Sequence, residues 1–418
     1  MGYQVPKGTR DILPDEVGEW QFAEERFREV CRRFGYREIR TPVFEQTELF
    51  VRSVGEDTDI VRKETYTFDD RGGRSLTLRA EGTAPAVRAY IEHNLAGQAG
   101  RVVKLYYLAP VFRYDRPQKG RYRQHHQAGM EAIGSQDPAL DAEIIELALA
   151  WWQELGVTGC RVMINSVGCG ECWPAYLEKL KGAIGQALPQ LCADCQQRYQ
   201  TNVRRILDCK QEQCRAATQG VPYQVDHLCP ECAAHFGSVR RCLEAVGIQY
   251  EVNPRIVRGL DYYTKTAFEV SHEALGAQDA LGGGGRYDGL VEACGGKPTP
   301  GVGAGLGIER ALLVREALGL RVGAADGGRC FLAVVGQEAK CRAVALLSEL
   351  RRAGIAADMN HTGGSLKAQL RRADSDGWEY VAILGEDELA RGTVTLRCMN
   401  TGEQREVPQA DLAREVAG

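Results

Sequence analysis

Four pairs of closely spaced cysteines set one segment of this chain apart from both of its flanks. Nine of the fifteen cysteines fall between residues 168 and 250. Pairs separated by two to four residues are typical of zinc sites, and two sites of four thiolates would use all eight paired cysteines. These are Cys169, Cys172, Cys192, Cys195, Cys209, Cys214, Cys229 and Cys232.

This segment predicts an inserted, mainly helical domain. Its apolar residues recur at helical spacing over 174–187 and 231–246, while large apolar side chains are few. Bound zinc would therefore help to hold the segment together. The spacing does not decide which pairs share an ion. Reduced thiols packed as small hydrophobic side chains are the alternative.

The flanks predict an antiparallel α+β domain interrupted by the insertion. Residues 138–155 carry a strongly periodic helical pattern, and the alternation in "RIVRGLDYYTKTAFEV", residues 255–270, predicts a strand. Beyond a linker of small residues, strands and helices alternate, which predicts a small, mostly parallel α/β domain. The predicted divisions are 1–167, 168–250, 251–322 and 329–418.

Composition excludes some classes of protein. The net charge is −4 and the pI is near 6.1, which argues against a generally basic surface but allows a local basic patch. No run of about 18 apolar residues occurs, and the N-terminus lacks an apolar signal region. We therefore expect a cytoplasmic protein with no membrane segment, whose cysteines are thiols or metal ligands rather than disulfides.

A basic segment, "VFRYDRPQKGRYRQ" at 111–124, is a candidate anion site, because arginine side chains match phosphate bidentately. A solvated hairpin tip is the alternative for most of it. Arg113 differs, since it follows an apolar run and is expected to project into an interior cleft.

Two glycine-rich runs follow, "GGGGRYDGL" and "GVGAGLGIER". Their spacing fits neither a dinucleotide fingerprint nor a phosphate-binding P-loop. Such glycines could let a flat ring approach a strand, and ordinary turns are the alternative. Turns do not explain Arg310, which lies in the helix predicted after the second run.

Polar residues are also predicted to gather near a strand-to-helix corner. Thr83 is expected to cap the helix there, and Glu81 could pair with an amine. In "QHHQAGME" the alternation places Gln127, Gly129 and Glu131 on one strand face, with room for a ligand at the glycine. His125 and His126 fit ordinary histidines better than metal ligands.

Together these segments resemble the histidyl-tRNA synthetases, a family of class II aminoacyl-tRNA synthetases. "EERFREVCRRFGYREIRTPVFE", "YYLAPVFRYDRPQKGRYRQHHQAGMEAIG" and "GVGAGLGIERALL" are similar to class II motifs 1, 2 and 3. "RGLDYYTKTAFEV" and "GGGRYDGL" resemble two signatures of the histidine-specific enzymes. The resemblance implies an antiparallel catalytic sheet and a C-terminal anticodon-binding domain.

The resemblance also implies an activity and its substrates. The histidine carboxylate would attack the α-phosphate of ATP with Mg²⁺ present, and histidine would then pass to the 3′-terminal adenosine of tRNA(His). Arg113, Arg258 and Arg310 would be catalytic, with Arg113 and Arg258 on opposite sides of the α-phosphate and Arg310 on the γ-phosphate. A homodimer is expected.

The implied binding residues fall into three groups. Those for ATP are Arg113, Arg121, Arg258, Gly305 and Arg310. Those for histidine are Glu81, Gly82, Thr83, Arg113, Gln127, Glu131, Arg258, Tyr262 and Tyr263. Those for the tRNA acceptor end are Arg116, Gln118, Lys119 and Arg123.

Two other functions are possible from sequence. A catalytically silent regulatory subunit of histidine biosynthesis would be expected to lose parts of the histidine-specific segments and the C-terminal domain, and both are present here. A structural nucleic-acid-binding protein would leave the polar residues Glu81, Gln127 and Glu131 unexplained.

Overall fold

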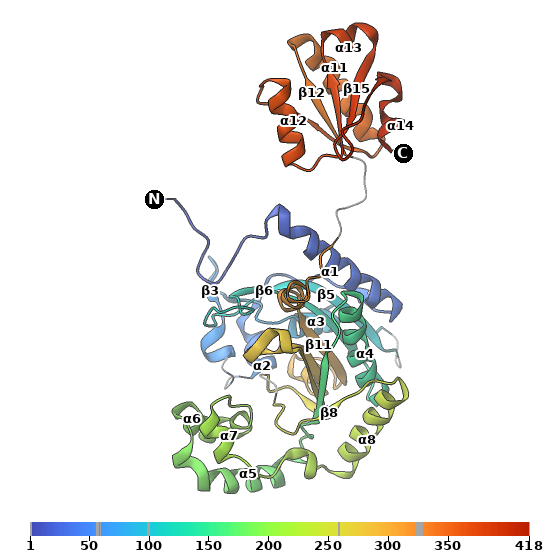
Figure 1. The fold of residues 1–418 in the computed structure, drawn as a ribbon. Coiled ribbons are helices and arrows are strands. Elements are labelled where there is room, and N and C mark those ends of the chain that lie inside the picture. The colour runs from blue at the N-terminus through green and yellow to red at the C-terminus, as the bar shows by residue number, and fades with distance from the viewer. Residues whose placement is uncertain are drawn as a thin grey trace. The chain divides into compact units, whose positions relative to one another are not determined.

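A computed structural model describes residues 2–417, except for 56–57, 59, 98–100, 258–259 and 323–328. The chain forms two compact units, Met1–Val322 and Gly323–Gly418 (Figure 1). Among the described residues, no helix combines the length and apolar character needed to cross a lipid bilayer.

An eight-stranded sheet forms the centre of the first unit. Its strand order is β1-β5-β6-β11-β10-β9-β7-β8. The inner pairings are antiparallel, and the two edge pairings, β1 with β5 and β7 with β8, are parallel. The strands are β1 Arg37–Glu38, β5 Val103–Phe112, β6 Gln124–Ile133, β7 Arg161–Ser166, β8 Glu251–Val252, β9 Thr264–Ser271, β10 Ala280–Arg286 and β11 Gly301–Gly307.

A smaller antiparallel sheet, in the order β2-β4-β3, lies in the same unit. Its strand β4 is followed along the chain by α3, whose first turn belongs to the candidate site. The bounds are β2 Phe44–Gln46, β3 Thr67–Asp69, β4 Ser75–Leu78, α2 Thr47–Val54, α3 Thr83–Glu92, α9 Leu290–Ala293 and α10 Ile308–Ala317, with one π-helical turn at Ile60–Glu64.

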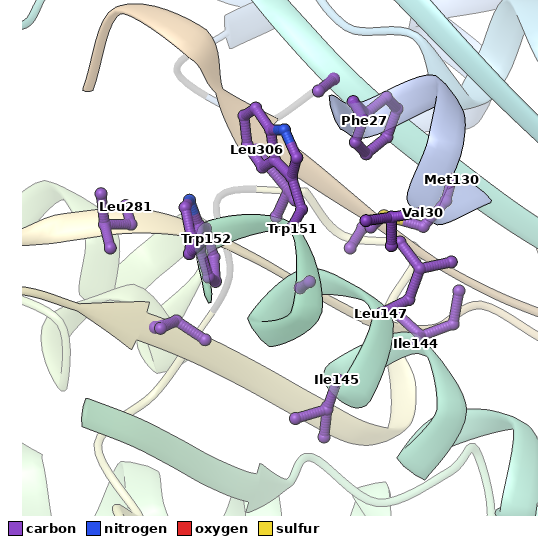
Figure 2. Close-up of a cluster of buried hydrophobic side chains, with 14 of the residues drawn as sticks. Phe27, Val30, Met130, Ile144, Ile145, Leu147, Trp151, Trp152, Leu281 and Leu306 are labelled. Atoms are coloured by element: carbon purple, nitrogen blue, oxygen red, sulfur yellow. The ribbon is translucent and has the colours of Figure 1, made fainter. Parts of the chain in front are cut away.

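The main core packs α1, Pro14–Arg33, and α4, Pro138–Glu154, against one face of the central sheet. α4 matches the predicted helix, and Asp137 caps it by accepting a hydrogen bond from the amide of Ala139 at 2.9 Å. Trp151 and Trp152 of α4 are fully buried in this core (Figure 2). This core therefore covers the face of the central sheet that α1 and α4 pack against.

Alternation along β6 separates the core from the other face. Ala128, Met130 and Ala132 belong to the main core. Because neighbouring side chains on a strand point to opposite faces, Gln127 and Glu131 lie on the face away from α4. The predicted shared face is confirmed, and it carries the candidate site.

The cysteine-rich segment is helical, as predicted. It leaves the sheet after β7, and the chain returns to it at β8. The helices are α5 Trp173–Ala187, α6 Ala193–Thr201, α7 Glu212–Ala217 and α8 Pro230–Ala245. The first three lie together, whereas α8 packs along α4 (Figure 1). The domain bounds 168–250 stay a prediction.

The strand predicted for residues 255–270 begins later than expected, at Thr264. The side-chain amide of Asn165 donates to the carbonyl oxygens of Pro254 and Ile256, at 3.3 and 3.1 Å. This part of the chain therefore bonds to a side chain instead of extending the β9 ladder. Lys265 adopts a φ of 51°, which interrupts the regular strand geometry one residue inside β9.

The second unit contains a five-stranded sheet in the order β13-β12-β14-β15-β16. β12 pairs in parallel with β13 and β14, while β15 and β16 add antiparallel pairings. The sheet is therefore mixed rather than mostly parallel. The bounds are β12 Arg329–Val334, α11 Gln337–Arg352, β13 Ala356–Met359, α12 Leu366–Ser375, β14 Tyr380–Leu384, α13 Glu386–Arg391, β15 Thr393–Cys398, β16 Gln404–Pro408 and α14 Leu412–Ala417.

Candidate functional site

The N-terminus of α3 is held by a buried carboxylate. The two oxygens of Glu81 accept hydrogen bonds from the amides of Thr83 and Ala84, each at 2.7 Å. Burial raises the pKa of Glu81, although these bonds oppose the rise. The prediction that Thr83 caps the helix is wrong, because Thr83 is its first residue and its own hydroxyl donates elsewhere.

Glu131 of β6 lies at the centre of the site, fully buried among hydroxyl groups. Its carboxylate accepts from Thr83 Oγ1 at 2.8 Å, from the Tyr107 hydroxyl at 3.1 Å and from the Tyr287 hydroxyl at 2.5 Å. Burial nevertheless raises the pKa of Glu131 to about 8. The site therefore holds a carboxyl group whose proton state responds to near-neutral pH and to any cation bound beside it.

The Tyr107 ring fills the space between two glycines. A Cβ atom added at Gly129 or at Gly82 would lie 2.1 Å from a ring atom of Tyr107. Gly129 pairs directly with Tyr107 across β5 and β6. The prediction that Gly129 leaves room for a ligand is therefore wrong, because the protein's own tyrosine takes that room.

The glycines of β11 make room for polar side chains of β6. A Cβ at Gly303 would lie 1.8 Å from Glu131 Oε2, and one at Gly305 would lie 1.8 Å from Gln127 Nε2. Gln127 in turn accepts a hydrogen bond from the amide of Gly82 at 3.1 Å. The space next to Gly303 and Gly305 is thus occupied by the carboxylate of Glu131 and the amide of Gln127, and not by the flat ring considered from the sequence.

Three tyrosines complete the polar wall. The ring centroids of Tyr262 and Tyr263 are 4.8 Å apart, and those of Tyr262 and Tyr287 are 5.8 Å apart. The Tyr262 hydroxyl lies 3.5 Å from Glu81 Oε2, and burial raises the pKa of Tyr262 well above its usual value. The predicted residues Glu81, Thr83 and Tyr262 therefore meet in one buried network.

Two of the predicted arginines act on the same histidine. Burial lowers the pKa of His125 to about 3, and the charges of Arg113 and Arg310 lower it further. Arg113 Nε donates to the carbonyl oxygen of Ala80 at 2.8 Å, next to Glu81. Arg310 donates to the carbonyl of Gly120 at 3.2 Å. A cationic region thus adjoins the tyrosine and carboxylate network, and Arg258 falls outside the described residues.

In the loop between β5 and β6, some residues are exposed to solvent and others contact neighbouring side chains. Arg116, Gln118 and Lys119 are exposed. Arg121 is paired with Asp115 at 3.1 Å. The Arg123 guanidinium lies 3.7 Å from the centre of a tyrosine ring, that of Tyr114. The last two residues therefore shape the loop, which presents the first three to solvent.

The eight paired cysteines form two separate groups. Cys169 and Cys172 meet Cys229 and Cys232, whereas Cys192 and Cys195 meet Cys209 and Cys214. Within each group the four sulfur atoms lie within 4.8 Å of one another. The structure thus shows which pairs lie together, which the spacing left open. We name these groups the proximal and the distal cluster.

Tyr107 and Tyr287 were missed in the sequence, although each carries a signal. Tyr107 stands in an apolar strand next to a second tyrosine, and its register partner is a glycine, which marks a large side chain that needs space. Tyr287 directly follows four glycines and an arginine. Neither signal names a partner without the strand register, so Glu131 was predicted without its hydroxyl donors.

Comparison with known sequences places both units. The family model for histidyl-tRNA synthetase matches residues 8–311, and that for an anticodon-binding domain matches residues 329–418. The chain is 53% identical to a histidine–tRNA ligase of Desulforamulus reducens over 407 residues, 97% of each chain. It is 48% identical to the histidine–tRNA ligase of Dehalococcoides mccartyi over 414 residues, 99% of each chain.

Solved structures agree with the sequence comparison. The crystal structure of apo histidyl-tRNA synthetase from S. aureus has a TM-score of 0.83 and 36% identity, covering 99% of this chain and 100% of that one. A Bacillus halodurans protein described as an ATP phosphoribosyltransferase regulatory subunit/histidyl-tRNA synthetase shares the fold at a TM-score of 0.64 and 23% identity. The family model covers most of the chain, and the two relatives match it over 97% and 99% of their lengths, so this chain belongs to the histidyl-tRNA synthetase family.

Proposed function

We propose that this protein ligates L-histidine to tRNA(His) in two steps. The histidine carboxylate attacks the α-phosphorus of ATP, the bond to the β-phosphate oxygen breaks, and pyrophosphate leaves. The 3′-terminal hydroxyl of the tRNA then attacks the carbonyl carbon of histidyl-adenylate, and AMP leaves. The observation that carries this assignment is the hydrogen-bonded network of Glu81, Thr83 and Glu131, with Arg113 bonded to the carbonyl of Ala80 beside Glu81.

The carboxyl network suits the amino acid. Glu81 and Thr83, with Gln127 nearby, would hold the α-ammonium group. Glu131 and Tyr262 or Tyr263 would read the imidazole. Histidine offers these polar groups hydrogen bonds that an apolar analogue cannot make, so a site of this kind favours histidine. The three hydroxyl donors around Glu131 fix its carboxylate before substrate arrives.

The arginines suit the chemistry of the first step. Two anions must approach each other, and negative charge grows on the phosphoryl oxygens. Preorganised cations on both sides of the phosphorus reduce the cost of that approach. We assign Arg113 and Arg258 to the α-phosphate, Arg310 to the γ-phosphate, and Arg121 and Gly305 to the rest of ATP. His125 stays neutral, so it does not compete for the phosphates.

Mg²⁺ would accompany ATP and neutralise charge on the departing pyrophosphate. Oxygen ligands are present near Arg310. Burial and the Arg121 charge lower the pKa of Arg310, while the carboxylates of Glu269 and Asp279 act in the opposite sense. These two carboxylates fit the ion's preference for oxygen. The eight paired cysteines take no part in this chemistry.

Several partners follow from the assignment. The exposed residues Arg116, Gln118 and Lys119, with Arg123, would contact the acceptor end of tRNA(His), and the unit that matches an anticodon-binding domain would contact the anticodon. A homodimer is the family expectation. The domain division at 167, 250 and 322 belongs to the same proposal.

Histidine-dependent exchange of pyrophosphate into ATP tests this function. The wild-type protein should catalyse exchange with histidine and not with phenylalanine, and Arg258→Ala should lose most of the rate while keeping its circular dichroism spectrum. A regulatory subunit would show no exchange. An Arg258→Ala variant with unchanged exchange would remove Arg258 from the mechanism.

A further inference from the structure

The proximal and distal clusters share one local construction, although they lie in different parts of the insertion. In the distal cluster, Cys192 precedes the first residue of α6 and Cys195 lies in its first turn. In the proximal cluster, Cys229 and Cys232 stand in the same positions of α8. A helix start favours negative charge, and hence a thiolate, at these positions.

A backbone hydrogen bond crosses each cluster in the same way. The amide of Cys229 donates to Sγ of Cys172 at 3.1 Å, from one arm of the insertion to the other. The amide of Cys192 donates to Sγ of Cys214 at 3.2 Å. Sulfur accepts such bonds best as thiolate, and thiolate is the form that binds metal. The repetition of this detail points to a built site rather than to chance packing.

The sulfur spacing matches a single tetrahedral ion. In the proximal cluster, Sγ of Cys169 lies 3.8 Å from that of Cys172 and 3.9 Å from that of Cys229. A zinc–sulfur distance of about 2.3 Å in a tetrahedron places neighbouring sulfurs about 3.8 Å apart. A disulfide would instead bring two sulfurs to about 2.05 Å. None of the fifteen cysteines, each of which the structure describes, forms a disulfide.

Burial supports a closed, structural site. Cys195, Cys214 and Cys232 are fully buried, and Cys172 is nearly so. Cysteines supply three of the eleven buried members of the insertion's own hydrophobic cluster. Part of that core therefore consists of thiols packed among apolar side chains. Four protein ligands also leave no open position for a catalytic water.

The two clusters are nested along the chain. The distal cluster closes the chain between Cys192 and Cys214, inside the longer segment that the proximal cluster closes between Cys169 and Cys232. The distal cluster also borders a cavity of about 380 Å³ whose lining includes Arg113. An ion held by the distal cluster would order the part of the insertion that lines this cavity together with Arg113.

The proximal cluster joins the insertion to the catalytic sheet. The amide of Lys265 donates to the carbonyl of Gly168 at 2.6 Å, and the Lys265 ammonium pairs with Glu231 of α8 at 2.8 Å. His235 of α8 lies 3.2 Å from the buried carboxylate of Asp141 in α4. Both arms of the insertion are therefore attached to the sheet next to the proximal cysteines.

We propose that each chain binds two structural Zn²⁺ ions, one held by Cys169, Cys172, Cys229 and Cys232, and the other by Cys192, Cys195, Cys209 and Cys214. Binding converts four thiols to thiolates and releases up to four protons per ion. The proximal ion links the two ends of the insertion where they contact the central sheet. The distal ion holds α6 and α7 together. This assignment does not depend on the proposed reaction.

Metal analysis of the full chain, purified without chelators from zinc-supplemented medium, tests the proposal. The wild-type protein should contain two zinc ions per chain. Cys232→Ser and Cys214→Ser should each contain one, and Cys242→Ser, which lies outside both clusters, should retain two. A content below one zinc per chain, or iron in its place, would overturn the proposal.

A second measurement remains decisive if a variant fails to fold. The wild-type protein, exchanged with Co²⁺ under mild conditions, should show thiolate-to-cobalt charge-transfer absorption that saturates at two equivalents. Limited proteolysis after partial removal of zinc should cut between residues 188 and 221 before it cuts at 168–172. Absence of the charge-transfer bands, or simultaneous cleavage throughout 168–250 at every chelator concentration, would contradict the two nested sites.

Discussion

The pocket around Glu131 and the cysteine-rich insertion hold their polar groups in place by different means. In the pocket, three hydroxyls fix one carboxylate, and a large apolar core on the other face of the sheet supports the strand that carries it. In the insertion, the hydrophobic cluster is small and includes cysteines, so hydrophobic burial contributes less. The pocket therefore depends on apolar burial and hydrogen bonds, whereas the insertion would depend on the two zinc ions proposed above.

The largest expected effect separates chemistry from folding. Arg113→Ala should reduce histidine-dependent pyrophosphate exchange by about 10²–10³-fold, because it removes a fixed cation from the proposed phosphate site. Zinc content should stay at the wild-type value. Arg71→Ala, an exposed arginine between β3 and β4, is the matched control and should keep full exchange. An unchanged rate for Arg113→Ala would show that the cationic region is not catalytic.

The next effect concerns pH and the buried carboxyl. The pKa of Glu131 is raised from 4.5 to about 8 in the folded chain, so the folded state binds more protons than the unfolded state between these values. The free energy of unfolding should therefore fall as pH rises from about 5 to 8 and then level off. Urea unfolding of Glu131→Gln should show a shallower decline over this range.

The control for that experiment is Glu25→Gln, an exposed residue of α1. It should leave the pH dependence of unfolding as in the wild-type protein. If Glu131→Gln and Glu25→Gln give the same slope between pH 5 and 8, the buried carboxyl is not the group that titrates.

Two glycine substitutions give intermediate effects of opposite sign. Gly129→Ala places a methyl group against the Tyr107 ring and should destabilise the protein by about 1–3 kcal/mol. Gly182→Ala in α5 meets nothing within 4 Å and should stabilise the insertion by up to about 1 kcal/mol, since alanine favours helix. Thermal unfolding measures both. Equal effects would mean that the pocket is less tightly packed than the structure indicates.

The smallest expected effect lies on the exposed loop. Lys119→Ala should leave the rate of pyrophosphate exchange unchanged. It should also keep the free energy of unfolding within about 0.5 kcal/mol of the wild-type value. It should weaken tRNA(His) binding and lower the slope of log affinity against log salt by about one. Filter binding at several salt concentrations measures this slope. A full loss of exchange in Lys119→Ala would place this residue in the catalytic site instead.

Sequence patterns predicted the parts of the site that depend on local geometry. Alternation along β6 placed Gln127 and Glu131 on one face, because a strand has a period of two. Two helices of the insertion, α5 and α8, agreed with the bounds predicted for them to within one residue, because their apolar spacing is regular, whereas α6 and α7 were not predicted. The cysteine spacing brought the two members of each pair together for the same local reason.

Contacts between distant segments could not be predicted in this way. The position of Tyr107 over Gly129 depends on the register between β5 and β6, which no single strand encodes. The grouping of Cys169 with Cys229 depends on the path of the chain between two residues that are 60 positions apart. The side chain of Asn165, which comes from another strand, binds the carbonyls of Pro254 and Ile256 ahead of β9, and this contact between distant segments was not predicted.

The parallel pairing of β7 with β8 limits how the insertion can change in evolution or by design. Two parallel neighbours cannot be joined by a tight turn, so the chain must travel back along the sheet before it enters β8. Everything from α5 to α7 could in principle be exchanged for another module, provided that a return path remains. α8, packed on α4, is that return path, and a shortened enzyme would have to keep it or replace it with another crossover.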